Sequence, residues 1–118
     1  MFGSKLQETV NNVSGGHAAI LMGFDGIPVD MYSKEPEPDI EIIGMEFSVI
    51  LKEVRKAAEM LDSGTAEELM IKTEKLSTII RVVTDEYFLA LAVNPEGNIG
   101  KARYLLRILA PEFMKELT

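Results

Sequence analysis

The chain has 118 residues and a mass of 13.1 kDa, and its 47% apolar content can supply the core of one domain covering 1–118. Its net charge of −7 excludes the cationic surface that nucleic-acid binding requires. The lack of cysteine excludes disulfides and thiol chemistry, and the apolar runs are too short to span a bilayer, so we expect a cytoplasmic protein without membrane insertion.

The first third of the sequence predicts a helix followed by a hairpin. Residues 2–13 carry apolar residues at helical spacing and are followed by two glycines. The apolar runs 17–24 and 27–33 flank Asp25-Gly26, a dipeptide that favours a tight type I′ turn. We therefore expect two antiparallel strands here.

A proline-interrupted acidic loop, Ser33 to Asp39, separates this hairpin from a long helix. The helix is predicted to begin after Asp39 and to run to about Asp62, where Gly64 stops it. Ser4, Asp39 and Asn98 are the candidate N-caps of the three predicted helices.

The rest of the chain predicts three strands, over 66–74, 77–84 and 87–93. A final helix follows within 95–117 and is expected to bend or restart at Pro111. The last two strands are apolar on both faces, so their sheet must be covered on both sides. We therefore predict an α+β fold: a three-layer α/β/α sandwich around a five-stranded, mainly antiparallel sheet, in the order α-β-β-α-β-β-β-α.

The long helix carries two apolar stripes. At about 100° per residue, the first stripe is the one expected to pack on the sheet. The second lies on another side of the helix and needs a second cover, which either another part of the chain or a partner surface can provide. The first stripe comprises Ile43, Phe47, Ile50, Val54, Ala57, Ala58 and Leu61, and the second comprises Ile42, Met45, Val49 and Met60.

The element order, the hairpin segment GFDGIPVDMY and the tail YFLALAVNPEGNIGKARYLLR resemble the roadblock/dynein light chain family, which has a profilin-like fold. The chain is most similar to stand-alone bacterial members such as the B subunit of the gliding-motility GTPase switch. The resemblance implies a homodimeric, non-enzymatic scaffold that binds a Ras-like small GTPase and acts on its nucleotide cycle, as a GTPase-activating protein does. It does not account for the acidic loop.

In this family the long helix and the following strand meet their counterparts in a second chain. The resemblance therefore implies a dimer contact formed by the second stripe and by an edge strand from Glu68 to Lys75. Lys72 and Glu74 are expected to face the same side of that strand, within reach of opposite charges in the partner. The implied dimer contact residues are Ile42, Met45, Val49, Met60, Met70, Lys72 and Glu74.

Exposed charges on the paired long helices are the expected contact with the GTPase, unless they form only a solvated face: Glu46, Lys52, Glu53 and Lys56. An arginine finger must reach the γ-phosphate from an exposed loop. None of the arginines falls in a predicted loop, so any stimulation of hydrolysis should come from the GTPase's own residues.

Several residues could instead carry chemistry of their own. Asp25 and Asp30 could form a catalytic carboxylate pair, but Asp25 has a role in the turn and Asp30 is expected at the surface of a strand. The acids of the loop lack the spacing of a calcium loop, and no second histidine or cysteine can complete a metal set with His17. The segment 97–102, GNIGKA, lacks the earlier glycine and the Ser or Thr of a phosphate loop, so it predicts a helix start. We expect no catalytic residue, metal or cofactor. The alternative function is that of a small-molecule sensor with a profilin- or PAS-like fold.

Overall fold

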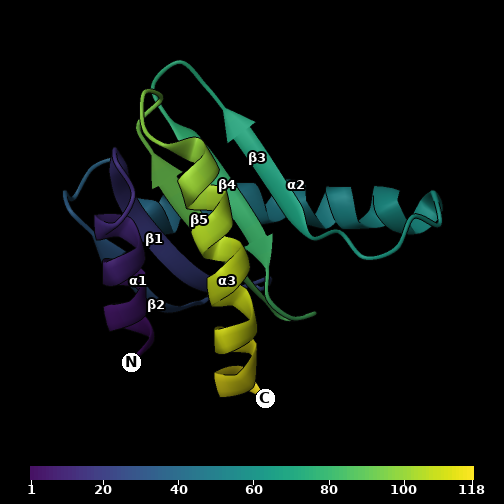
Figure 1. The fold of residues 1–118 in the computed structure, drawn as a ribbon. Helices are drawn as coiled ribbons and strands as arrows, with labels where there is room; N and C mark the ends of the chain where they lie inside the picture. Colours follow the sequence, from purple (N-terminus) through teal and green to yellow (C-terminus); the bar gives the residue numbers. More distant parts are fainter.

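Three helices and five strands follow one another in the predicted order in the computed structural model, which describes residues 1–118 (Figure 1). The order α-β-β-α-β-β-β-α is therefore confirmed. The elements are α1 (Phe2–Asn11), β1 (Gly16–Gly23), β2 (Pro28–Ser33), α2 (Ile40–Met60), β3 (Glu68–Lys72), β4 (Ser77–Val82), β5 (Tyr87–Val93) and α3 (Ile99–Leu117).

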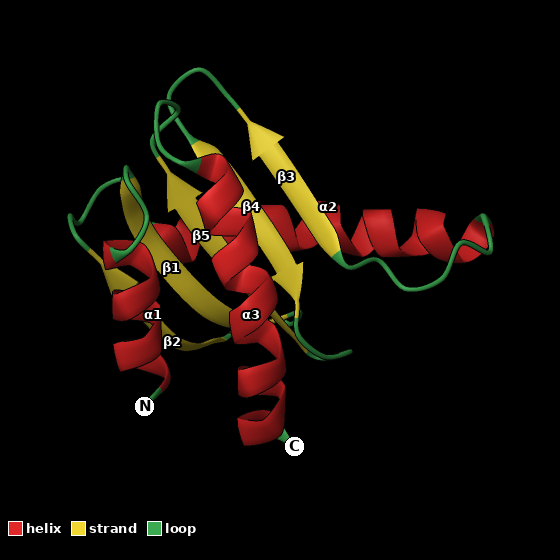
Figure 2. Ribbon diagram, in the orientation of Figure 1, coloured by secondary structure: helices red, strands yellow, loops and turns green.

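The strands form one antiparallel sheet in the order β2-β1-β5-β4-β3. Figure 2 shows α1 and α3 on one face of this sheet and α2 on the other, which confirms the three-layer sandwich. The central strands β1 and β5 are buried along almost their whole length, as the apolar run 87–93 predicts. Strands β2 and β3 form the two edges of the sheet.

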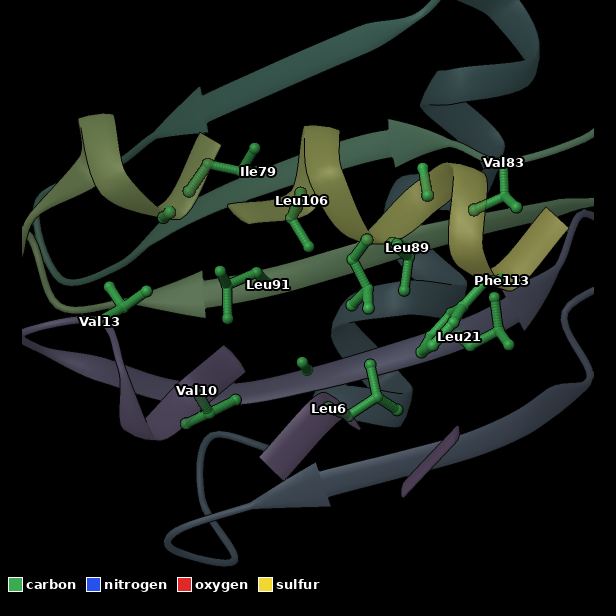
Figure 3. Packing of buried hydrophobic residues seen from close by; sticks show 14 of the residues in the cluster. Leu6, Val10, Val13, Leu21, Ile79, Val83, Leu89, Leu91, Leu106 and Phe113 are labelled. Atoms are coloured by element: carbon green, nitrogen blue, oxygen red, sulfur yellow. The ribbon is translucent and has the colours of Figure 1, made fainter. Parts of the chain in front are cut away.

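Alternate side chains of the central strands supply two separate cores, one on each face. Leu21, Leu89 and Leu91 point toward α1 and α3, where they pack with Leu106 and Phe113 (Figure 3). On the opposite face, the next side chains along the same strands pack against α2. They are Ala18, Ile20, Met22, Phe88, Ala90 and Ala92.

The turn forms at Asp25-Gly26 as predicted, but the predicted type I′ geometry is wrong, because that type requires a positive φ at both central residues and Asp25 does not have one. Gly26 has a φ of +88°, a conformation that glycine adopts without a steric penalty. The Asp25 carboxylate accepts a hydrogen bond of 3.1 Å from the backbone N–H of Ile27. Asp25 therefore stabilises the turn, and its carboxylate is engaged there.

Two of the three predicted N-caps are confirmed. The Asp39 carboxylate accepts from the N–H of Glu41 at 2.9 Å, and the Asn98 side chain accepts from the N–H of Lys101 at 3.0 Å. The prediction for Ser4 is wrong, because α1 begins at Phe2 and the Ser4 hydroxyl donates to the carbonyl of Met1.

Some predicted boundaries are also wrong. Strand β3 ends at Lys72, because Thr73 starts the turn into β4 by donating to the carbonyl of Leu76 through both its N–H and its hydroxyl. Glu74 therefore lies outside the strand and does not share a face with Lys72. Helix α3 continues through Pro111 and does not restart there.

The Asp39 cap gives a direct test of the start of α2. Asp39→Ala removes the acceptor for the first turn of the helix and should lower the free energy of unfolding by about 1 kcal/mol. Urea denaturation measures this change. Glu37→Ala, in the same acidic loop, makes no comparable bond and serves as the control. Equal losses in the two variants would show that the cap does not stabilise the helix.

Candidate interaction surface

Helix α2 packs closely on the sheet along a narrow face. Ile40, Gly44, Ser48 and Leu51, three or four residues apart, are its buried residues. A Cβ atom at Gly44 would lie 3.0 Å from the sulfur of Met22. The absence of a side chain there lets the first half of the helix approach β1.

The predicted core stripe of α2 is correct for the first half of the helix and wrong for the second. Ile43 and Phe47 pack into the core, whereas Ile50 is 44% exposed and Leu61 is 76% exposed. Ala57 is exposed as well. Length explains the difference. A helix of 21 residues extends about 31 Å, whereas five strands are only about 19 Å wide. Figure 1 shows the second half of α2 running past β3.

The second stripe of α2 is not covered by any part of the same chain. Ile42 is 58% exposed, Met45 46%, Val49 60% and Met60 86%. This outcome excludes the alternative in which another segment of the chain packs on the stripe. Apolar side chains that recur along one helix face and remain in water mark an interaction surface more often than isolated ones do.

Strand β3 presents an unpaired edge beside the overhanging half of α2. Val82 donates to the carbonyl of Glu67, and Thr73 donates to that of Leu76. Because bonding directions alternate along a strand, the N–H and C=O groups of Glu68, Met70 and Lys72 point away from β4. This edge can therefore accept a further strand.

The charged residues predicted to contact a GTPase all lie on the exposed part of α2. Glu46, Lys52, Glu53 and Lys56 are exposed, and Lys56 forms an ion pair with Glu53 at 3.6 Å. An exposed pair of this kind contributes little to stability. The four side chains are available to a partner, and their role in GTPase binding remains a prediction.

Arg55 is engaged within the fold. Its guanidinium lies 4.1 Å from the centre of the Phe24 ring and donates to the carbonyl of Asp85 at 3.2 Å. It therefore connects α2 to two turns at one end of the sheet. The other arginines lie in β4 and α3, so the expectation that none lies in a loop is confirmed.

Arg81 and Arg103 converge on the carboxylate of Glu68. Arg103 donates to one oxygen of Glu68 at 3.0 and 2.7 Å, and Arg81 lies 4.0 Å from the other oxygen. The hydrogen bond, followed by the negative charge of Glu68, raises the pKa of Arg103. This cluster could not be predicted from the sequence, because its members come from β3, β4 and α3 and only the sheet order brings them together.

The remaining chemical candidates have structural roles. Asp30 lies beside Gly3 at the start of α1, where a negative charge is favourable, and it accepts from the N–H of Met31. The His17 ring forms a hydrogen bond of 2.8 Å with the carbonyl of Pro38 and so anchors the acidic loop. No three His, Cys, Asp or Glu side chains gather at one point.

The helix start predicted for 97–102 is confirmed, with Asn98 as its cap. A Cβ atom at Gly97 would lie 2.5 Å from the carbonyl oxygen of Ser14, so this glycine permits close packing of two loops. None of the three helices combines the length and apolar character needed to cross a bilayer.

Comparison with known proteins identifies the fold. Residues 3–93 match the model of the Roadblock/LC7 domain. The chain belongs to the Roadblock/LC7 family. MglC from Myxococcus xanthus is 42% identical to it, with 98% of each chain covered and a TM-score of 0.70. The resemblance noted in the sequence is therefore confirmed. A search of curated protein sequences gives no significant match.

More distant structures share the architecture of this Roadblock/LC7 chain. A Roadblock/LC7 domain from Streptomyces avermitilis is 16% identical, with a TM-score of 0.87 and coverage of 98% of this chain and 96% of that one. MglB from Myxococcus xanthus is 10% identical, with a TM-score of 0.86 and coverage of 98% and 93%. At such identities these structures support the fold alone. In sequence, the chain is more similar to MglC than to this MglB.

Proposed function

We propose that the Roadblock/LC7 chain forms a homodimer through α2 and β3, and that the dimer is a regulatory scaffold for a Ras-like small GTPase. One observation carries the first half of this proposal. A helix that extends beyond its own sheet keeps apolar side chains exposed next to an unpaired strand. A second copy of the chain can cover the exposed apolar side chains of α2 and pair with the free edge of β3 through one interface.

Pairing of two β3 edges would continue the sheet into the second chain. The overhanging half of each α2 would then lie over the partner's strands. Ile50, Ala57 and Leu61 continue the line of Ile43 and Phe47, so they would contact the partner's sheet as those residues contact their own. The second stripe, from Ile42 to Met60, would pack against the other α2.

Charge favours one register of the two strands. Paired residues in an antiparallel ladder point to the same face, so a pairing centred on Met70 places Glu68 opposite Lys72 and Leu69 opposite Ile71. In this register an acidic side chain lies opposite a basic one, and an apolar side chain lies opposite another apolar one. In this arrangement Glu68, and not Glu74 as predicted from the sequence, is the acidic residue that faces Lys72 of the second chain.

The apolar area involved is sufficient for association. Burying about 400 Å² of apolar surface contributes roughly 10 kcal/mol at about 25 cal/mol per Å², before the loss of translational and rotational freedom is subtracted. That loss removes a large part of the gain, so we expect a dimer with a dissociation constant below the millimolar range.

Val49→Glu should dissociate the dimer, because it places an unpaired charge in a dry contact. Light scattering coupled to gel filtration at tens of micromolar should give a dimer mass for the wild type and a monomer mass for the variant. Gln7→Glu adds the same charge on the exposed side of α1 and should remain dimeric. A wild-type chain of monomer mass would contradict the proposed dimer.

The family resemblance motivates the GTPase partner. The placement of the arginines limits the mechanism, because Arg55 is held against Phe24 and Arg81 pairs with Glu68. We therefore propose that the dimer donates no catalytic group. It would act by binding the active conformation of the GTPase more tightly, which shifts the population of the switch residues.

The GTPase proposal is tested with purified Ras-like GTPases from the same cell, loaded with GDP or with a GTP analogue. We expect tighter binding of the GTP-analogue form, and weaker binding after Lys52→Glu or Lys56→Glu. Any stimulation of hydrolysis should survive Arg55→Ala, Arg103→Ala and Arg107→Ala. Equal affinity for the two nucleotide states would contradict the proposal that the dimer acts by binding the active conformation of the GTPase more tightly. A variant that binds but has lost all stimulation would reveal an arginine finger.

No observation favours the alternative of a small-molecule sensor. The spaces between the sheet and its helices are filled by the two apolar clusters, in which Leu21, Leu91 and Phe88 are fully buried. The hollows on the surface are open, whereas small-molecule sites are usually enclosed on most sides.

A further inference from the structure

One strip of the sheet lacks a helix on the side of α1 and α3. Helix α1 packs on β1 and β2, and α3 packs on β4 and β5. Between α3 and the edge strand β3 lies an open hollow of about 400 Å³. Figure 2 shows β3 beyond the flank of α3, with no further helix over it.

Three of the chain's arginines line this hollow: Arg81, Arg103 and Arg107. Arg81 and Arg103 already share the carboxylate of Glu68. Arg107 forms no ion pair and lies with its guanidinium 5.6 Å from the centre of the Tyr104 ring. Glu67 is the second acid in the lining, so three arginines face two carboxylates and the hollow has an excess of one positive charge, although the whole chain has a net charge of −7.

The hollow continues into a second one with a more apolar lining. Both share Glu67 and Arg81, and the second also includes Val82, Val83 and Met114. On α3, Arg103, Tyr104, Arg107 and Met114 recur at intervals of one, three and seven residues, so they follow one side of the helix. The result is a groove beside β3 with an excess of cations at one end and a more apolar lining, which also contains Asp85, at the other.

We propose that this groove binds an acidic segment of a protein partner, with carboxylates on Arg103 and Arg107 and apolar side chains beside Tyr104 and Met114. Glu68 already illustrates the contact, because Arg103 holds its carboxylate with two N–H groups. Nucleic acid is disfavoured by repulsion from the net charge of −7. The open shape of the groove suits an extended or helical segment. This site is separate from the GTPase contact proposed on α2.

A displayed library of random 15-residue peptides tests the proposal. The wild-type chain is the bait, and Arg107→Glu is used for counter-selection. Peptides specific for the wild type should be rich in Asp and Glu and should also contain apolar residues. Fluorescence anisotropy with the synthesised peptides should then show affinity reduced roughly tenfold or more by Arg107→Glu. Lys115→Glu, which makes an equal change of charge on α3 outside the hollow, should leave the affinity unchanged.

Arg107 is exposed, so its replacement should not impair folding, and thermal melting checks this point. If Arg107→Glu is destabilised, Arg107→Gln replaces it in both steps. Failure to recover peptides specific for the wild type, or recovery of peptides without excess acid, would overturn the proposal. An equal loss of peptide affinity in the Lys115→Glu control would also overturn it. Displacement of the peptides by micromolar inorganic phosphate or by single-stranded RNA would do the same.

Discussion

The mismatch between the length of α2 and the width of the sheet determines what this chain can do. A helix that ended at the edge of the sheet would bury its apolar stripe within its own chain. Because α2 continues past β3, its second half keeps Ile50 and Leu61 in water. The close contact at Gly44 fixes the first half against β1, so the helix cannot shift to hide these side chains.

The order of the strands places an unpaired edge next to the part of α2 that extends beyond the sheet. Strand β3 is at the edge on the side where α2 projects, and its outward backbone groups are unpaired. An exposed edge beside exposed apolar side chains is an aggregation hazard unless a specific partner covers it. A second copy of the same chain satisfies both needs with one interface, and it leaves the charged residues of α2 accessible to a third component.

The two faces of the sheet then have separate tasks. The α2 face carries the proposed dimer contact and the proposed contact with a GTPase. The opposite face carries the arginine groove between α3 and β3. Because these surfaces lie on different sides of one rigid sheet, a scaffold of this kind could hold two partners at once without competition between them.

Much of the fold could be predicted from the sequence, because short-range patterns determine it. The order of helices and strands, the position of the turn at Asp25-Gly26 and the caps at Asp39 and Asn98 follow from local signals, and these are confirmed. The type of that turn is not confirmed. The end of β3 was misplaced because the Thr73 turn has no glycine or proline to mark it. The exposure of Ile50 and the arginine cluster depend on sheet order and strand number, which no local pattern reveals.

The most direct measurement of the central claim uses a thiol at the centre of the proposed β3 pair. The chain has no cysteine, so Met70→Cys introduces a single thiol. In the proposed register the two Cα atoms at position 70 would be about 5.5 Å apart, within the span of a disulfide. Mild oxidation at micromolar concentration should give a reducible covalent dimer from Met70→Cys and none from the exposed control Lys101→Cys. Absence of the covalent dimer, or equal yields from the two variants, would contradict the account.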